Sequence, residues 1–516
     1  MQGQVYRSVR MAALAAALGL AGCSLRPSPL GAGDAAHYVA DIRTAIAFDH
    51  EPLARPLDLY EALARALKFN QELKAEAMSR LLGEADLALR SAEMLPQLVA
   101  SAQVYQRSNS AASVSRAVAS GTRSGFYSES SERLSRSGDL SFSWNLLDFG
   151  VSYFRARQAA DRSLISAEQH RKVAARIIEE TRAVFWRAAA LQKLDQGLRA
   201  LDHEMTGALA NAAQLSLAGL TEPGEALGVQ RDLLAIRRDI DLHRRSLVGA
   251  EDQLRALINL PATEPLRLSI EGQAPIPMPG RLSFEDLAHV ALTNRPDVRQ
   301  SIYEQRITAE EARLAFLELF PGLNLVAGAA LDQNPFLLNQ GWTSVAARAS
   351  WQLVKLLQYP ARSGLIEAKG ELDRQRSRAL AVAAILQAQV GVLRLRHAHD
   401  EYRTLDRLAN VQRQLARHTE NQQRVGRVGT QATTRERMNA LLSDSRRDAA
   451  YGEVQAAYAA VLTAHGQDAA ELGQAAIMPV ADLAAWLRQA ERSAFAVMPR
   501  PATGPERLAA TGNGGR

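Results

Sequence analysis

Residues 57–96 read LDLYEALARALKFNQELKAEAMSRLLGEADLALRSAEMLP, and residues 282–321 repeat the pattern as LSFEDLAHVALTNRPDVRQSIYEQRITAEEARLAFLELFP. Six positions match at a single offset of 225 (321 − 96 = 225): Leu57, Ala66, Leu67, Glu72, Glu93 and Pro96 correspond to Leu282, Ala291, Leu292, Asp297, Glu318 and Pro321. In each copy, helically spaced apolar residues run up to the proline, which blocks further helix. An offset that is kept over the whole stretch indicates an internal duplication.

Alternating strands follow each proline. Apolar and polar residues alternate with a period of two after Pro96, and the alternation returns before Trp144. Four strands are expected, at about residues 97–107, 139–147, 322–332 and 342–352. A polar, Ser-rich loop over residues 108–138 joins the first pair, whereas the second pair has a short loop. Such strands suit either a half-buried soluble sheet or a membrane barrel with a wet lumen.

A long helix follows each pair of strands. Helical spacing continues with few breaks over residues 153–217 and 362–425, which at 1.5 Å per residue makes rods of roughly 90 to 100 Å. A coiled-coil seam with a seven-residue repeat is formed by Ile177, Val184, Leu191 and Leu198. Both rods end at glycine-containing turns, and returning helices are expected over residues 225–258 and 433–465.

The beginning of the chain has the features of an export signal. Arg7 and Arg10 precede an apolar run from Met11 to Leu20, and Leu-Ala-Gly stands before Cys23, the only cysteine of the sequence. These residues resemble a bacterial lipoprotein signal. The resemblance implies cleavage before Cys23 and attachment of lipid, such as palmitate, to it. With Cys23 lipidated no disulfide can form, so stability must come from packing or assembly.

The sequence divides into six expected segments. They are a lipoprotein signal peptide (1–22), a lipid-anchored tether (23–56), the first repeat (57–260), a Pro-rich linker (261–281), the second repeat (282–467) and a partly disordered C-terminal tail (468–516). After residue 23, no uninterrupted apolar run approaches the eighteen or so residues that a spanning helix needs. Any passage through a membrane is therefore expected to use the strands.

Charge and motifs exclude several functions. The net charge of +6 is spread along helices that also carry Asp and Glu, which favours solvated helix faces over a nucleic-acid surface. Gly31-Ala32-Gly33 lacks the preceding strand and third glycine of a dinucleotide site. His397 and His399 lie on opposite sides of a helix without a third ligand. We expect no enzymatic activity, no metal and no cofactor apart from lipid on Cys23.

The number of strands has its own consequence. A sheet inside a bilayer cannot keep unpaired edges in hydrocarbon, and four strands are too few to close a barrel. If these strands are in a membrane, the chain must associate with further copies of itself. The heptad seam of the rods agrees with this expectation, because such helices bury their apolar stripes against one another or against neighbouring subunits.

Three motifs together resemble the TolC-type outer-membrane factor family, over roughly residues 57–467. They are Trp144-Asn145-Leu146-Leu147-Asp148-Phe149-Gly150 before a long helix, Ala291-Leu292-Thr293-Asn294-Arg295-Pro296-Asp297, and Val428-Gly429-Thr430. The resemblance implies a mainly α fold with membrane β, a TolC-like duplicated architecture. In it, four strands per chain complete a trimeric, twelve-stranded barrel, which a long periplasmic α-helical barrel continues.

The function implied by the resemblance is a passive exit duct in the bacterial outer membrane, extending into the periplasm, for a tripartite efflux or type I secretion system. The implied partners are two further copies of the chain, outer-membrane lipid, a periplasmic adaptor (membrane fusion) protein, and an inner-membrane pump or ABC transporter. Drugs, metal ions, polysaccharide and polypeptide all stay open as cargo. The alternative from another class is a periplasmic coiled-coil scaffold or surface lipoprotein without a channel.

Site residues follow from the same resemblance. At the implied periplasmic gate the chain carries Glu225, Arg435, Glu436, Arg437 and Met438, so a constriction of mixed charge is expected instead of the family's acidic ring. The implied adaptor-contact tips are Gly219, Leu220, Thr221, Arg424, Val428, Gly429 and Thr430. Trp144 and Trp351 are interpreted as membrane-interface aromatics in preference to simple packing residues. Trp351 to Pro360 replaces the Asp-Phe-Gly of the first copy, so the second strand-to-helix junction is expected to be longer.

Overall fold

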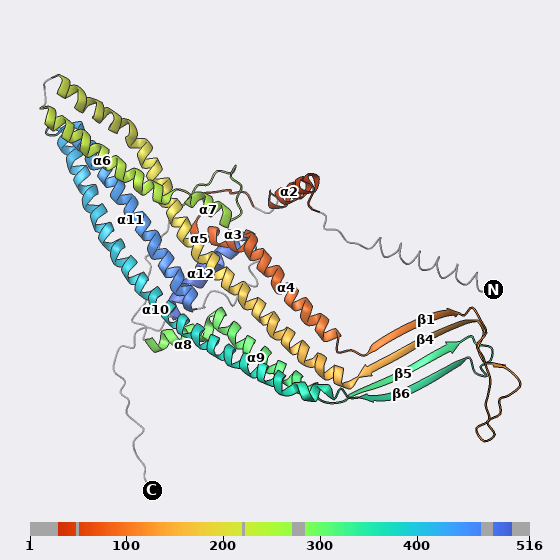
Figure 1. Ribbon diagram of the computed structural model, residues 1–516. Helices are drawn as coiled ribbons and strands as arrows, with labels where there is room; N and C mark the ends of the chain where they lie inside the picture. The colour runs from red at the N-terminus through yellow and green to blue at the C-terminus, as the bar shows by residue number, and fades with distance from the viewer. Residues whose placement is uncertain (1–28, 48–50, 219–221, 271–283, 466–477, 498–516) are drawn as a thin grey trace, which may run out of the picture. The chain divides into compact units, whose positions relative to one another are not determined.

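The computed structural model describes residues 29–47, 51–218, 222–270, 284–465 and 478–497 (Figure 1). The chain forms two compact units, residues 1–52 and residues 53–516. The first unit contains one described helix, α2 (Ala32–Ala47), whose side chains are almost all exposed. Helix α2 lies within the expected tether of residues 23–56, for which no secondary structure is predicted. Cys23 lies outside the described residues, and its lipidation stays a prediction.

The duplication is visible in the bounds of the helices. The first copy contains α3 (Leu59–Phe69) and α4 (Gln71–Ala92), and the second contains α8 (Phe284–Asn294) and α9 (Pro296–Leu317). Each of the four bounds moves by 225 residues between copies, for example from 59 to 284 and from 92 to 317. The break between the helices has a local cause in each copy. Asn70 accepts hydrogen bonds from the backbone N–H groups of Glu72 and Leu73, and Pro296 begins α9.

The strands form one antiparallel sheet in the order β1-β4-β5-β6. Their bounds are Gln97–Gln106 for β1, Leu134–Asn145 for β4, Gly322–Asp332 for β5 and Gly341–Ser350 for β6. These ranges agree with the expected strands except that β4 starts five residues before residue 139. A small separate hairpin, β2 (Ala112–Ser113) with β3 (Ser128–Glu129), forms within the Ser-rich loop predicted over residues 108–138. Because β4 pairs with β5, the sheet joins the two copies.

Two long helices leave the sheet at the same end (Figure 1). They are α5 (Leu146–Leu217, 72 residues) and α10 (Val354–Arg424, 71 residues), each about 100 Å long. Both start about seven residues earlier than predicted. The Asn145 side chain caps α5 immediately after β4, whereas three residues separate β6 from α10. The second strand-to-helix junction is thus longer, and Pro360 lies within the first turns of α10.

The returning helices differ between the copies. In the second copy α11 (Thr430–His465) is continuous. In the first copy the expected single helix over 225–258 is divided into α6 (Pro223–Leu247) and α7 (Ala250–Leu257). Gly249, with φ of 89°, causes the break because this left-handed backbone conformation cannot continue a helix. Helix α7 then packs into the apolar core around α3 through Leu254 and Ile258.

The predicted heptad seam is buried. Ile177 and Val184 lie in the core formed by α3, α5 and α7, and Leu191 lies in the next core along α5, with Leu198 packed against it. Another apolar stretch had been missed. Among the described residues, α10 contains an 18-residue stretch that is long and apolar enough to cross a membrane, with at most two charged residues. Only 28% of this stretch is buried. The expectation of no such stretch relied on uninterrupted runs, whereas α10 mixes leucine, valine and alanine with glutamine.

The segment expected to be a partly disordered tail, residues 468–516, contains an ordered helix. Helix α12 (Val480–Val497) buries Val480, Leu483 and Ala484 against the core that contains α3. The amphipathic spacing of these residues explains the docking. The first part of the expected linker, residues 261–270, is packed. Leu268 forms a bridge with Leu57, and the side chain of Gln192 of α5 hydrogen-bonds the backbone of both Leu266 and Leu268. Residues 261–270 are therefore part of the packed unit.

A buried arginine connects the two copies with α12. Arg182 of α5 is 4% exposed, forms an ion pair with Glu491 of α12, and donates to Gln455 of α11 at 3.1 Å. Its guanidinium lies 5.5 Å from the ring of Tyr458. Burial and the neighbouring Glu491 raise the pKa of Tyr60 to about 12. Helix α12 is thus held by a buried charge pair as well as by apolar packing.

Candidate functional site

The two faces of the four-stranded sheet differ in chemistry. Residues that are opposite each other in the register lie on the same face. One row across the sheet consists of Leu98, Phe142, Ala327 and Val345. A row on the other face contains Gln103, Ser137 and Asp332. The predicted alternation therefore produces one continuous apolar face and one largely polar face.

The apolar face is uncovered in the single chain. Leu98, Leu140, Phe142 and Leu331 are all exposed, and Val345 keeps 88% of its surface. The sheet also has two unpaired edges, because β1 and β6 each pair on one side only. With ten to twelve residues each, the four main strands have the length of membrane-spanning strands.

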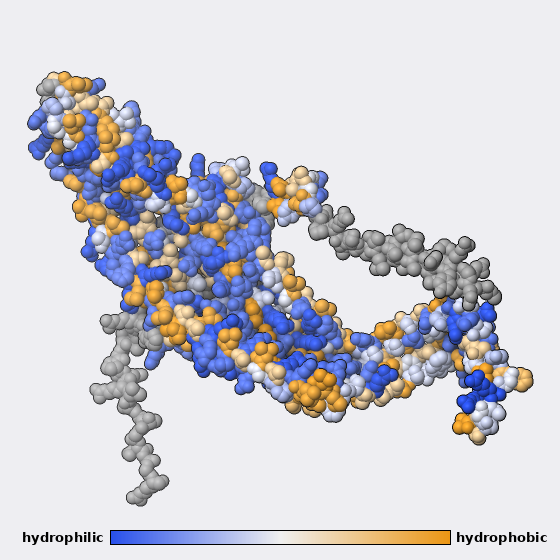
Figure 2. Space-filling model, viewed as in Figure 1, coloured by the Kyte–Doolittle hydropathy of each residue, from blue (hydrophilic) through white to orange (hydrophobic). Residues whose placement is uncertain are grey.

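Aromatic residues gather where the sheet meets the long helices. Trp144 lies near the end of β4 and contacts Phe149 edge-to-face at 5.9 Å, whereas Trp351 follows β6 and donates its indole N–H to the Leu319 carbonyl at 2.8 Å. Phe316 and Phe320 at the end of α9 are exposed, and Figure 2 shows a hydrophobic patch there. The sequence analysis missed these two phenylalanines, although their position just before Pro321 mirrors the end of α4.

The other end of the long helices is a sharply formed turn. Helix α10 ends in a Schellman motif, in which the N–H of Gly426 (φ 72°) bonds the Gln423 carbonyl and that of Arg427 bonds the Gln422 carbonyl. Arg424 and Arg427 are exposed at this turn. Of the predicted tip residues, Arg424, Val428, Gly429 and Thr430 thus lie together, while Gly219, Leu220 and Thr221 fall outside the described residues.

The first turns of α11 carry a network of ion pairs. The Arg437 guanidinium lies 2.7 Å from Glu204 of α5 and 2.7 Å from Glu420 of α10. These two hydrogen bonds raise the pKa of Arg437. Arg435 pairs with the neighbouring Glu436 at 3.1 Å. Arg437 of α11 therefore contacts both α5 and α10, and its pair with Glu204 connects the two copies close to the turn at the end of α10.

The predicted gate residues divide into exposed and buried groups. Glu225, in the first turn of α6, and Arg435 are exposed. Glu436 is buried and accepts from Gln412, and Met438 is 2% exposed within an apolar core shared with α5 and α6. Met438 was expected to line a constriction, which the structure contradicts, because its position on α11 directs it toward the first copy's helices. Among the predicted gate residues of the second copy, Arg435 is the charged residue that is exposed.

Two further polar contacts hold α11 against the first copy. Lys193 of α5 pairs with Asp448 at 2.7 Å, and His243 of α6 hydrogen-bonds Ser445 at 3.0 Å. Burial lowers the pKa of His243, so the imidazole is mostly neutral near pH 7. Together with Arg437, these residues form a line of polar contacts along α11 that sequence patterns did not reveal, since the partners are about 200 or more residues apart.

Close packing between α5 and α11 depends on Gly197. A Cβ atom at this position would clash with Cδ1 of Leu441. We expect Gly197→Ala to destabilise the protein by about 1–2 kcal/mol, because the forced movement of Leu441 outweighs the gain in helix propensity. The control is Gly207→Ala in the same helix, where nothing lies within 4 Å, and a gain of roughly 0.5–1 kcal/mol is expected. Equal shifts of the thermal unfolding midpoint for both variants would contradict the close contact.

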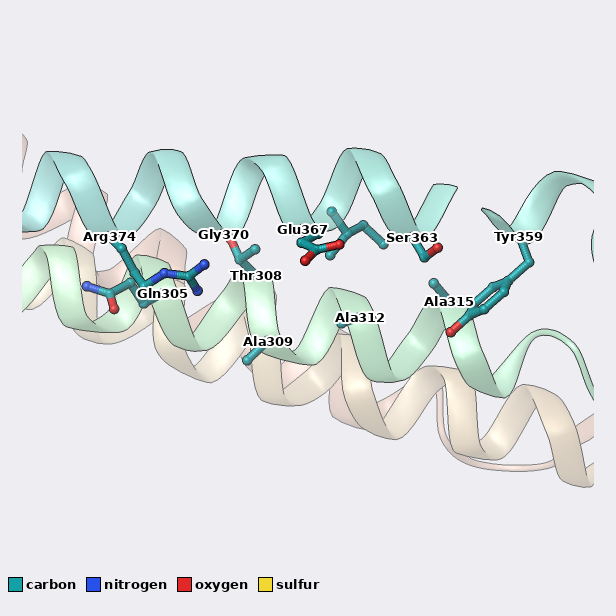
Figure 3. Close-up of a pocket in the computed structure, with 11 residues that line it drawn as sticks. Gln305, Thr308, Ala309, Ala312, Ala315, Tyr359, Ser363, Glu367, Gly370 and Arg374 are labelled. Carbon is teal, nitrogen blue, oxygen red and sulfur yellow. The ribbon is translucent and has the colours of Figure 1, made fainter. Parts of the chain in front are cut away.

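A groove of about 400 Å³ lies between α9 and α10 (Figure 3). Ala309, Ala312 and Ala315 form its α9 side, and Tyr359 and Glu367 are among the residues on its α10 side. The groove contains no histidine or cysteine, and no cluster of three or more metal-ligating side chains occurs anywhere in the described part of the chain. Its small side chains suit the packing of another helix better than chemistry on a substrate.

Helix α10 also presents an apolar stripe that stays exposed among the described residues. Leu365 and Leu372 are exposed seven residues apart, Leu386 and Leu393 continue the same heptad positions, and Ala379 stands between the two pairs. This stripe accounts for part of the apolar stretch noted above. A heptad stripe in contact with solvent is typical of a coiled-coil surface that pairs with another helix.

Comparisons with known proteins identify the fold. No protein-family model and no curated protein matches the chain. Among solved structures, it is similar to the outer-membrane channel OprN (15% identity, 79% of this chain and 89% of that chain, TM-score 0.59). It is also similar to the Campylobacter jejuni CmeC outer membrane channel (12% identity, 84% and 89%, TM-score 0.61). A third is the open state of the Neisseria gonorrhoeae MtrE outer membrane channel (16% identity, 79% and 90%, TM-score 0.57).

The fold is accordingly that of the outer-membrane channels. The expected fold class, mainly helical with a small β-sheet and a TolC-type architecture, is confirmed by these similarities.

Proposed function

We propose that this protein is the outer-membrane exit duct of a tripartite efflux or type I secretion system, a passive channel without enzymatic activity. The amphipathic sheet is the observation that carries the proposal. It has strands of spanning length, one exposed apolar face, one polar face and two open edges. In water such a face would be left unburied, whereas in a bilayer it contacts lipid while the polar face lines an aqueous lumen.

The proposed assembly is a homotrimer. Three sheets joined through the edges of β1 and β6 would form a closed barrel of twelve strands, which removes every unpaired edge. The exposed heptad stripe of Leu365, Leu372, Leu386 and Leu393 would pack against a neighbouring subunit in the same assembly. The Ala-lined groove between α9 and α10 offers a second surface for such a helix contact.

The proposed gate is the helical end around α11, and the proposed adaptor contact is the turn that carries Arg424 and Arg427. We propose a periplasmic adaptor protein and an inner-membrane pump or ABC transporter as partners, since an energy source has to lie outside a passive duct. Lipid on Cys23 would anchor the chain to the outer membrane. The solved structures support the outer-membrane location, as their names describe outer-membrane channels.

Breaking the Arg437 contacts should open the gate. In Arg437→Gln, two partly exposed ion pairs are lost, each worth up to about 1 kcal/mol, which would raise the ratio of open to closed channels by up to roughly thirtyfold. The matched control is Arg435→Gln, which removes a single contact within α11 and should change little. Single-channel recordings in planar bilayers measure both. Equal open probabilities for the two variants would exclude Arg437 from the gate.

Purification and bilayer recording test the function as a whole. We expect a trimer that resists dissociation in dodecyl sulfate until heated, that needs detergent for solubility, and that conducts ions across a planar bilayer. A monodisperse protein that is soluble without detergent and shows no conductance would reject the channel and favour the scaffold or surface lipoprotein. Mass spectrometry of the N-terminal peptide tests lipidation of Cys23 separately.

A further inference from the structure

The loop between β1 and β4 carries an unusual exposed tip, residues 114–127. Val118 is fully exposed to solvent. Phe126 and Tyr127, which follow each other in the sequence, are 85% and 81% exposed. A group of exposed apolar side chains bordered by polar residues is a typical feature of an interaction site, whereas a single exposed apolar residue is ordinary. Figure 2 shows strongly hydrophilic and hydrophobic side chains close together on this loop. The tip is therefore amphipathic, although it belongs to neither face of the main sheet.

The tip is folded in a way that places two positive charges opposite each other. Arg116 and Arg123 form an antiparallel bridge, closed by hydrogen bonds from Ala117 N to Thr122 O at 2.9 Å and from Ser124 N to Ser115 O at 2.8 Å. Residues 107–128 contain no Asp or Glu, and within the described residues no ion pair involves either arginine. Like charges directly opposite are destabilising. The Arg116 Nε–H donates to the Gly121 carbonyl at 3.0 Å, which leaves the positive charge of Arg116 without an anionic partner among the described residues. An anion bound by both arginines would offset the cost of the two like charges.

The base of the loop holds the tip at one end of the sheet. Arg107 N bonds the Arg133 carbonyl at 2.8 Å, and the Asn334 side chain, from the second loop, bonds the Ser130 carbonyl at 2.9 Å. Because α5 continues from the opposite end of β4, the tip projects from the strand ends that are farthest from the helices (Figure 1). If the sheet spans the outer membrane, this end lies at the outer leaflet.

We propose that the tip of residues 114–127 binds a phosphate-bearing lipid surface, the headgroup layer beside the barrel. Arg116 and Arg123 would contact the phosphates, and Val118, Phe126 and Tyr127 would enter the boundary between headgroups and acyl chains. Arginine recognises phosphate through its planar fork of donors, and aromatic rings favour the membrane interface. The inference rests on the proposed function for the location of the sheet.

The second loop supplies an internal comparison. Residues 333–340 include Phe336 and Leu338, and Leu338 is 98% exposed, yet the loop has no charged residue. Both loops therefore expose apolar side chains at the same end of the sheet, but only the first adds positive charge. Binding of the first loop should depend on anionic lipid, whereas any contact of the second loop should not.

Fluorescence quenching by brominated lipid tests the proposal on the full-length protein. A bimane label is attached to Val118→Cys or to Leu338→Cys, and the unsubstituted chain, whose only cysteine is Cys23, measures background labelling. Each protein is reconstituted into vesicles of dibrominated phosphatidylcholine with and without 30% phosphatidylglycerol. We expect quenching at position 118 to rise with phosphatidylglycerol, and Arg116→Gln with Arg123→Gln to lower the ratio of bound to free tip by roughly thirtyfold. Quenching at position 338 should be the same in both vesicles.

A third label separates this inference from the proposed function. Val345→Cys lies on the apolar face of β6 and should be quenched in both vesicles if the sheet spans the bilayer. Quenching at position 345 without any at position 118 would overturn the lipid-binding tip and leave the channel intact. Absence of quenching at position 345 would overturn the channel. In that case, binding of the tip to anionic lipid would still be supported if quenching at position 118 depended on phosphatidylglycerol and on the two arginines. Quenching at position 118 that is insensitive to both would overturn the role of Arg116 and Arg123.

Discussion

Leu140→Arg is expected to prevent accumulation of the assembled trimer, whereas Ser141→Arg, one residue further along, is expected to leave assembly intact. Leu140 lies on the apolar face in the middle of β4, opposite Ala100 and Ala329. An arginine on the lipid face near the middle of a bilayer costs about 2–4 kcal/mol, and a trimer would incur this cost three times. Ser141 is directed to the polar face, opposite Val99 and Gly328, where a charge would meet water.

The measurement is the amount of heat-dissociable trimer in the outer-membrane fraction, followed by bilayer recording of whatever assembles. Ser141→Arg trimers should form normally and shift ion selectivity toward anions, because three positive charges would line the lumen. Two results would contradict the assignment of the faces. One is normal assembly of Leu140→Arg, and the other is loss of assembly in Ser141→Arg with Leu140→Arg unaffected.

Glu491→Gln should destabilise the docking of α12 by about 3–5 kcal/mol. The substitution leaves the guanidinium of Arg182, which is 4% exposed, without an anionic partner in a buried site. Gln455 and the ring of Tyr458 would still contact the guanidinium but cannot neutralise its charge. Amide hydrogen exchange in residues 480–497 should therefore become much faster in the variant than in the unsubstituted protein.

Two controls separate the buried charge from helix packing. Arg488→Ala removes a partly exposed ion pair of α12 with Asp58 and a contact of the guanidinium with the ring of Tyr60. It should cost about 1 kcal/mol, well below the effect of Glu491→Gln. The double substitution Arg182→Met with Glu491→Met replaces the pair by apolar side chains and should be far less destabilising than Glu491→Gln alone. If Glu491→Gln and Arg488→Ala had the same small effect on exchange, the buried pair would not hold α12.

Periodicity was sufficient to predict the sheet. Alternation at residues 97–107 and 322–332 matched β1 and β5 closely, because a strand that separates two environments must change side-chain chemistry at every residue. The offset of 225 between the copies predicted where the second pair of helices lies relative to the first. The extension of β4 to Leu134 was missed, since Arg136 and Gly138 interrupt the apolar pattern there.

Long-range pairing was beyond what a local pattern indicates. Arg437 was predicted to lie at a constriction of mixed charge. Its ion-pair partners are Glu204 of α5, which is 233 residues away in the sequence, and Glu420 of α10, which is 17 residues away. Met438 looked like a neighbouring gate residue, yet it is buried between the hairpins. The docking of α12 through Arg182 joins residues that are 309 apart. Sequence separations of this size conceal charge pairs, because each residue's local surroundings resemble an ordinary solvated helix.

Local patterns in the sequence predict the duplication, the alternating strands, the heptad rods and, if the strands lie in a membrane, association with further copies of the chain. These features depend on local periodicity, and backbone geometry converts periodicity into faces. Only the tertiary structure decided which strands pair, that β4 and β5 join the two copies, and that β1 and β6 are the open edges. It also decided which charged residues of α11 are buried and which are exposed, because their burial depends on which helices pack together. Contacts between residues that are far apart in the sequence leave no recognisable local sequence pattern.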